Sequence, residues 1–152
     1  MTTAGRWFEE FEAGQRFETG TRAIGEAEVR AFAELSGDRN PLHLDEAWAR
    51  GSVFGERVAH GALGLAVATG LVNQLRLTHG TLVALAGVTW DFLKPIRFGT
   101  TVRGLLTVES VRGTSRPERG LVVLGVDLVS DAGEVVQRGT LRLLVRRRPE
   151  EG

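Results

Sequence analysis

The stretch ALGLAVATGLVNQLRL, residues 62–77, decides how this chain is expected to fold. Its large apolar residues lie on several faces of a helix rather than on one stripe: Leu63, Leu65, Val67, Leu71, Val72 and Leu75. A helix that is apolar on all sides is buried inside a protein. Its glycines cost helix propensity, and close approach of a surrounding sheet would explain them. The sequence therefore predicts one buried helix, too short and too often interrupted by polar residues to span a membrane.

Strands are expected after this helix and shorter helices before it. Residues 82–92 alternate with the period of a strand, and Pro95 ends the run. The segments 101–111, 121–130 and 135–145 are also β-rich, with glycine-containing turns between the later ones. Upstream, the pattern predicts an arm leading into a strand (7–21), a helix (25–35), a short second helix (44–50) and a loop (51–58). Helices followed by antiparallel strands indicate an α+β architecture, here a single domain over residues 1–152.

Composition excludes several classes of function. A chain of 152 residues, 42% of them apolar, can bury a core. The formal net charge of +0 gives no general attraction to nucleic acid or to a membrane surface. With no cysteine, the chain has no disulfide, thiolate metal site or cysteine nucleophile. The N-terminus lacks the apolar core of a signal peptide, so a cytoplasmic location is expected. The charged tail, about 146–152, is expected to be a frayed end.

A second stretch, FAELSGDRNPLH at residues 32–43, carries the chemistry. Gly37 permits a backbone conformation that larger residues resist, and Pro41 keeps Asn40 out of the helical region. We therefore expect a stiff loop that holds Asp38 close to His43, and such a pair can position and deprotonate a water molecule. The same residues are also ordinary turn formers, with His43 as a capping or surface residue, and the segment alone leaves both interpretations open.

The same stretch resembles the signature of the MaoC-like, (R)-specific enoyl-CoA hydratase family. The resemblance rests on an aromatic residue, a Ser-Gly-Asp-x-Asn-Pro-aliphatic-His core and a small residue beyond it: Phe32, Ser36, Gly37, Asp38, Asn40, Pro41, Leu42 and His43, with Trp48 and Ala49 nearby. A second family feature, Ala-His-Gly ahead of an apolar helix, is present as Ala59, His60 and Gly61. The resemblance covers nearly the whole chain, more weakly after about Trp90, and implies the hot-dog fold, a sheet wrapped around a central helix. The pattern of elements is compatible with that fold without singling it out.

The resemblance also implies roles for individual residues. Asp38 and His43 would hold the water that adds to a trans-2-enoyl thioester, and the sequence does not decide which of them takes the first proton. Gly61 would donate its backbone N–H to the thioester oxygen, at a helix N-terminus that favours negative charge. Thr69 would hydrogen-bond the catalytic acid, although a helix hydroxyl more commonly bonds its own backbone.

Other residues are expected to support the site or to bind substrate. Ser36 and Asn40 would brace the loop, whereas His60 is expected to be structural and His79 a solvated loop histidine. The phosphates of coenzyme A could meet three basic residues, and one aromatic residue could form part of the acyl wall: Lys94, Arg97 and Arg103, and Phe54.

Around the basic residues the match to the family is weaker, because Thr100 stands where the family usually has Asp. The three histidines show no metal-ligand spacing in the sequence, so neither a metal nor a redox cofactor is expected.

The expected substrate is an acyl-CoA, with an acyl-carrier-protein thioester left open. The exposed sheet edge of an isolated hot-dog favours a homodimer or higher homo-oligomer, and a heteromeric dehydratase is a variant of this. Two alternatives are a hot-dog thioesterase and a non-catalytic acyl-CoA-binding protein. The first usually carries its acid on the central helix, where residues 62–77 contain no Asp or Glu. The second would not need Asp38 and His43 together.

Overall fold

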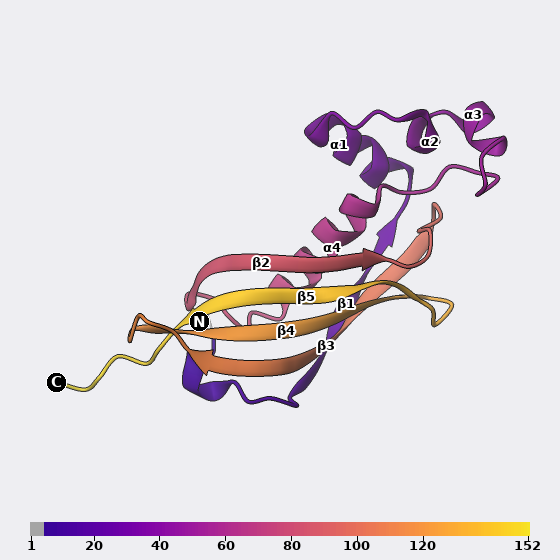
Figure 1. The fold of residues 1–152 in the computed structure, drawn as a ribbon. Coiled ribbons are helices and arrows are strands. Elements are labelled where there is room, and N and C mark those ends of the chain that lie inside the picture. Colours follow the sequence, from indigo (N-terminus) through magenta and orange to yellow (C-terminus); the bar gives the residue numbers. More distant parts are fainter. Residues whose placement is uncertain (1–4) are drawn as a thin grey trace.

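The structure is a computed structural model that describes residues 5–152, and it contains one antiparallel sheet with a long helix against it (Figure 1). The strands lie in the order β1-β3-β4-β5-β2. Their bounds are Arg16–Ile24 (β1), Leu82–Phe92 (β2), Thr100–Gly113 (β3), Arg119–Ser130 (β4) and Val135–Arg146 (β5). The helices are a 3-10 turn, Phe8–Glu10 (η1), and Glu26–Ser36 (α1), Pro41–Leu44 (α2), Glu46–Arg50 (α3) and Gly61–Gln74 (α4).

The long helix, α4, packs against the sheet chiefly over β1, β3 and β4. On β4 every second residue from Val122 is apolar and buried: Val122, Leu124, Val126 and Leu128. Leu63, Ala68 and Leu71 of α4 are buried as well. Full burial of such side chains stabilises the fold by roughly 1.5–3 kcal/mol each for the larger ones. This antiparallel sheet curled around one helix is a hot-dog, which confirms the predicted fold.

The helix itself differs from its prediction in two ways. It ends at Gln74 rather than at Leu77, because the chain turns and Arg76 adopts a left-handed φ of 59°. Ala66 and Gly70 are exposed, so α4 is buried on its sheet-facing side and open on another. Close approach of the sheet explains Gly64, where a Cβ would collide with the Gln137 amide. It does not explain Gly70, which faces open space.

Three helices lie beyond one end of the sheet (Figure 1). The predicted helix 25–35 is α1, which ends at Gly37 with a left-handed φ of 78°. The predicted helix 44–50 corresponds to α3, and α2 lies mostly in the stretch from Asp38 to His43 that was expected to be a loop. Pro41 begins a separate turn, and the Asp45 carboxylate accepts the N–H of Trp48 at 3.0 Å to start the next one.

The C-terminal tail is held in place at its start, so the expectation of fraying from residue 146 is wrong there. Arg146 completes β5. The N–H of Arg147 donates to the carbonyl of Glu118 at 2.8 Å, and its guanidinium lies over the ring of Phe8. The N–H of Arg148 donates to the Glu9 carboxylate at 3.0 Å. Opposite charges on η1 and the tail explain this attachment.

The outer strand β2 leaves apolar side chains in solvent. Those more than a third exposed are Leu82, Val83, Leu85, Val88 and Phe92. Unpaired N–H and C=O groups along such an edge can pair with another strand. Within residues 5–152, no helix is long and apolar enough to cross a membrane.

Candidate active site

The loop between α1 and α2 holds itself in shape through side-chain hydrogen bonds to its own backbone. The Ser36 hydroxyl donates to the carbonyl of Phe32 at 2.6 Å and accepts the N–H of Asp38 at 3.1 Å. The Asp38 carboxylate accepts the N–H of Asn40 at 3.2 Å, and the Asn40 amide oxygen accepts that of Leu42 at 3.0 Å. Ser36 and Asn40 thus both bond the backbone of this loop. Asp38 is exposed at the top of this loop.

His43 is fixed in one tautomer by its surroundings. Its Nδ1 lies 2.7 Å from the carbonyl oxygen of Val58. A carbonyl can only accept a hydrogen bond, so Nδ1 carries the proton and Nε2 of the neutral ring keeps its lone pair. His43 is half-buried on α2. This arrangement leaves one imidazole nitrogen free to accept a proton.

His60 lies between the loop and α4 and is almost fully buried. Its Nε2 donates to the carbonyl oxygen of Asp38 at 2.8 Å, while Nδ1 is buried with no hydrogen-bond partner among the described residues. Its ring stacks on His43 with centroids 3.9 Å apart and meets Phe32 edge-on. Burial lowers the pKa of His60; the hydrogen bond that His60 donates to the Asp38 carbonyl opposes that shift, and the nearby His43 adds to it. His60 is therefore neutral near pH 7.

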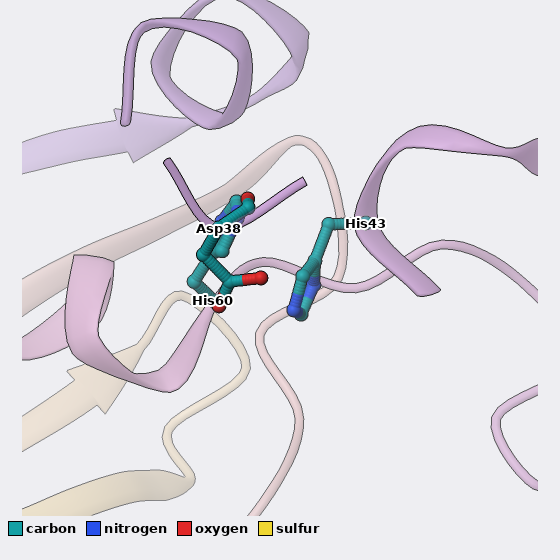
Figure 2. A group of neighbouring side chains, drawn as sticks. All are labelled: Asp38, His43 and His60. Carbon is teal, nitrogen blue, oxygen red and sulfur yellow. The ribbon is translucent and has the colours of Figure 1, made fainter. Parts of the chain in front are cut away.

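The fold brings Asp38, His43 and His60 together, each offering one ligand atom within 4.8 Å of the others. Figure 2 shows the Asp38 side chain pointing toward the His43 ring, with His60 behind it. Such a group can hold a water molecule, and by its chemistry a divalent cation too. One nitrogen of each imidazole is already bound to a backbone carbonyl. The spacing of the histidines along the chain gave no sign that His43 and His60 would meet beside Asp38.

A cavity of about 570 Å³ opens beside this cluster, between the loops and the N-terminus of α4. Its walls are mostly apolar, and its lining residues include Leu42, His43, Phe54, Gly61, Phe92 and Ile96. Gly61 is the first residue of α4, where backbone N–H groups lack partners within the helix. A Cβ on Gly61 would lie 2.9 Å from the Phe92 ring, so a side chain here would have to displace that ring. A ligand in the cavity would therefore meet an imidazole, backbone donors and apolar walls.

Comparison with known proteins agrees with this geometry. Residues 9–129 match the MaoC like domain. The chain belongs to the MaoC-like family. An (R)-specific enoyl-CoA hydratase from Rhodospirillum rubrum is 30% identical over 141 residues, which cover 91% of each chain. Protein MaoC from Klebsiella aerogenes is 34% identical over 105 residues, 67% of this chain, and the chain spans only 30% of that protein. A solved monoamine oxidase regulatory protein from Archaeoglobus superposes with a TM-score of 0.92 at 28% identity, covering 98% of this chain and 99% of that one.

Two of the other predicted residues of this MaoC-like chain lie in or beside the cavity. Phe54 and Lys94 line it, and Lys94 also pairs with Glu134 at 3.1 Å. Arg97 is engaged in holding the loop that carries Phe54. It donates to the Phe54 carbonyl at 3.0 Å and to the Glu56 carboxylate at 2.8 Å.

Two predicted residues are placed elsewhere. The Thr69 hydroxyl donates to the carbonyl of Ala66 at 2.7 Å, so it makes the local helix bond rather than the bond to Asp38 that the resemblance implied. Arg103 on β3 pairs with Glu18 on β1, at the opposite edge of the sheet from β2 and away from the residues that line the cavity. Neither residue lines the cavity of this MaoC-like chain.

Gln137 was not predicted as part of the site. Gln137 is buried, lines the cavity and donates from Nε2 to the carbonyl of Gly61 at 3.1 Å. Trp90 donates from its indole Nε1 to the other end of the same amide at 2.8 Å. A signal did exist: Gln137 is in phase with the inward residues Leu141 and Leu143, and a polar residue in that series needs a buried partner.

Proposed function

We propose that this MaoC-like protein hydrates trans-2-enoyl thioesters reversibly to (R)-3-hydroxyacyl thioesters. The observation that carries the proposal is the placement of the Asp38 carboxylate and the His43 imidazole together beside a cavity at the N-terminus of α4. The name of the Rhodospirillum rubrum relative, an (R)-specific enoyl-CoA hydratase, supports the same reaction and stereochemistry.

In the proposed reaction one water molecule lies between Asp38 and the Nε2 atom of His43. Its oxygen bonds to C3 of the enoyl thioester while one O–H bond breaks, and the site takes up that proton. The same pair then delivers a proton to C2, so water is added across the double bond and the site returns to its first state. Val58 holds His43 in the tautomer that can accept the proton. We assign the transferred proton to the pair rather than to either residue.

Negative charge develops on the thioester oxygen as water adds, and Gly61 is placed to stabilise it. Its N–H lies at the positive end of α4, where the helix dipole and free donors favour an anion. One such preorganised donor lowers the barrier by about 3 kcal/mol in other enzymes. The Phe92 ring over Gly61 shields this position from one side. Addition of water changes no overall oxidation state, so the proposed reaction needs no redox cofactor, and the pair supplies the proton transfers.

The acyl group is carried by coenzyme A in this proposal. Lys94 lines the cavity and is about half exposed, so its ammonium can leave Glu134 to meet a phosphate. An acyl-carrier-protein thioester would present the same reacting atoms. With either carrier, only the acyl chain would occupy the apolar cavity. Arg97 is less suited to phosphate, because its guanidinium is committed to Phe54 and Glu56.

A second copy of the chain is the proposed partner. The edge of β2 carries unpaired backbone groups and exposed apolar side chains. Helix α4 does not cover this edge, because it packs chiefly against β1, β3 and β4. Pairing two β2 edges would continue the sheet and remove those side chains from water. A heteromeric dehydratase would use the same edge with a related chain.

The thioesterase alternative lacks a residue that it needs. Helix α4 contains no Asp or Glu, so no carboxylate projects from the central helix toward a thioester carbonyl. A non-catalytic binding protein would leave the hydrogen bonds that position Asp38 and His43 without a purpose.

The test is loss of the enoyl thioester absorbance when purified protein is mixed with crotonyl-CoA. We expect rapid loss with the wild type and a fall of at least about a hundredfold with Asp38→Asn or His43→Gln. Two matched controls, Asp45→Asn and His79→Gln, change the same residue types outside the cluster and should keep full activity. Release of free thiol in the same cuvette would instead indicate a thioesterase. Folded wild-type protein that neither hydrates crotonyl-CoA nor longer enoyl-CoA thioesters would contradict the proposal.

A further inference from the structure

Gln137 links the sheet to the first turn of α4. Its side chain comes from β5 and is 2% exposed. Nε2 donates to the carbonyl of Gly61 at 3.1 Å, and Oε1 accepts the indole N–H of Trp90 at 2.8 Å. Trp90 lies on β2, so one buried amide connects two strands with the start of the helix. Because burying an amide costs free energy unless it is hydrogen-bonded, both bonds are needed to keep Gln137 in this position.

Two glycines make room for this connection. A Cβ on Gly64, one turn into α4, would collide with the amide of Gln137. A Cβ on Gly139, which pairs with Trp90 across β5 and β2, would collide with the Thr89 carbonyl and the Trp90 ring. Helix and strand can therefore approach the tryptophan and the glutamine closely only because both positions lack a side chain.

The amide acts directly beside the proposed oxyanion site. Gln137 lines the same cavity as His43 and Gly61. Its hydrogen bond holds the carbonyl of Gly61, the residue whose own N–H lies at the start of the helix without an intrahelical partner. We infer that Gln137 is a positioning residue, which holds the first turn of α4 so that the Gly61 N–H stays directed at the thioester oxygen. This inference rests on the proposed hydration.

A purely structural role toward the Trp90 indole would need only an acceptor, whereas Gln137 also donates to Gly61. A methionine has a similar length, packs well in irregular apolar spaces and would fill the position without bonding Gly61. The matching donor and acceptor instead determine the orientation of the Gly61 carbonyl. Small displacements of catalytic donors have large effects, about a hundredfold in rate for roughly 1 Å.

The decisive variant is Gln137→Met, compared with Trp90→Phe and Thr19→Val in the crotonyl-CoA assay. We expect Gln137→Met to lower kcat and kcat/KM together by about tenfold to a hundredfold with little change in KM, the pattern of an interaction made in the transition state. Trp90→Phe keeps the bond to Gly61 and should lower kcat less. Thr19→Val removes another buried hydrogen bond, 2.7 Å from its hydroxyl to the N–H of Gly104, away from the cavity. It should lower Tm without lowering kcat.

A spectroscopic measurement separates positioning from stability. In an Asp38→Asn background, a bound dienoyl-CoA should show an absorption shifted to longer wavelength, because a donor to the thioester oxygen polarises the conjugated system. Adding Gln137→Met should reduce that shift, and adding Thr19→Val should not. If Gln137→Met does not fold, Trp90→Phe in the same background gives the answer through the same shift, which should be reduced to a smaller extent.

The outcomes distinguish this inference from the proposed function. An active wild type whose Gln137→Met variant keeps kcat, or loses only stability as Thr19→Val does, would overturn the role of Gln137 and leave the hydration intact. A wild type that hydrates no enoyl thioester would overturn both. A kcat loss accompanied by a reduced absorption shift supports positioning.

Discussion

The Nε2 atom of His60 lies 2.8 Å from the carbonyl oxygen of Asp38, and the same ring stacks on His43. A buried imidazole thereby holds the loop that carries the carboxylate and packs against the other member of the pair. His60 directly precedes α4, so the start of the helix and the catalytic loop are connected through one side chain. It is a positioning residue in the proposed hydratase, which agrees with the structural role expected from the sequence.

His60 should make stability depend on pH. Burial holds its pKa below the ordinary value of 6.5 in the folded protein, and unfolding restores that value. Between the two pKa values the unfolded chain binds more protons, so this contribution to stability is complete above the unfolded pKa and is lost as pH falls. We expect Tm of the wild type to fall more steeply than that of His60→Gln between about pH 7.5 and about pH 5.5. His79→Gln should follow the wild type, and parallel curves for wild type and His60→Gln would contradict the assignment.

Gly61 should tolerate no side chain in the active protein. In Gly61→Ala the new methyl group meets the Phe92 ring at 2.9 Å, so the ring or the first turn of α4 must shift beside the cavity. We expect kcat/KM to fall by about a hundredfold, comparable to the loss of one oxyanion donor. The double variant Gly61→Ala with Phe92→Ala relieves the clash and should recover part of the activity. A matched Gly70→Ala, where the structure shows open space, should keep activity and raise helix stability by about 1 kcal/mol. Full activity of Gly61→Ala would exclude this position as the oxyanion site.

The sequence predicted those parts of the fold that depend on periodicity and on local backbone chemistry. The alternation over residues 82–92 located β2, and Ser36 and Gly37 marked the end of α1. The open face of α4 could not be predicted, because an apolar helix looks the same whether a sheet or a second copy of the chain covers it. The break between α2 and α3 at Asp45 was not predicted. The Asp45 side chain caps α3 instead of continuing a helix, and the periodicity of apolar residues does not reveal such a cap.

The site was predicted as far as short motifs reach. Asp38, His43 and Gly61 lie within or beside recognisable local patterns, and the structure brings the first two together. Gln137 reaches Gly61 from 76 residues away, and only the strand order places it there. The ion pairs of Arg97 and Arg103 likewise depend on which acidic residues the fold brings near them. The sequence alone could not distinguish a basic residue available to a phosphate from one already paired with a carboxylate.

Lys94 should contribute to binding of coenzyme A thioesters and not to the chemical step. Lys94→Gln removes a cation from the cavity wall, and we expect KM for crotonyl-CoA to rise about two- to fivefold at low salt with kcat unchanged, the scale of an exposed ion pair. A short pantetheine thioester, which lacks the nucleotide phosphates, should show no such change. Arg112→Gln alters an exposed cation at the end of β3 away from Thr100 and serves as the control. An equal rise in KM for both thioesters would indicate that Lys94 acts on the acyl or pantetheine portion.

Charge on the β2 edge should control assembly. Leu85 and Val88 are 45% and 39% exposed on this strand, and burying them against a second β2 would contribute to association in proportion to the apolar area removed from water. The double variant Leu85→Glu with Val88→Glu places like charges opposite one another in a symmetric pair and should shift the protein to monomer in light scattering coupled to size exclusion. Val53→Glu is the matched control, because Val53 is 92% exposed but lies in the loop after α3. If the double variant forms an oligomer of the same mass as the wild type, the interface lies on another surface. A β2–β2 interface would bury two introduced carboxylates against two more without positively charged partners, which is too costly in free energy.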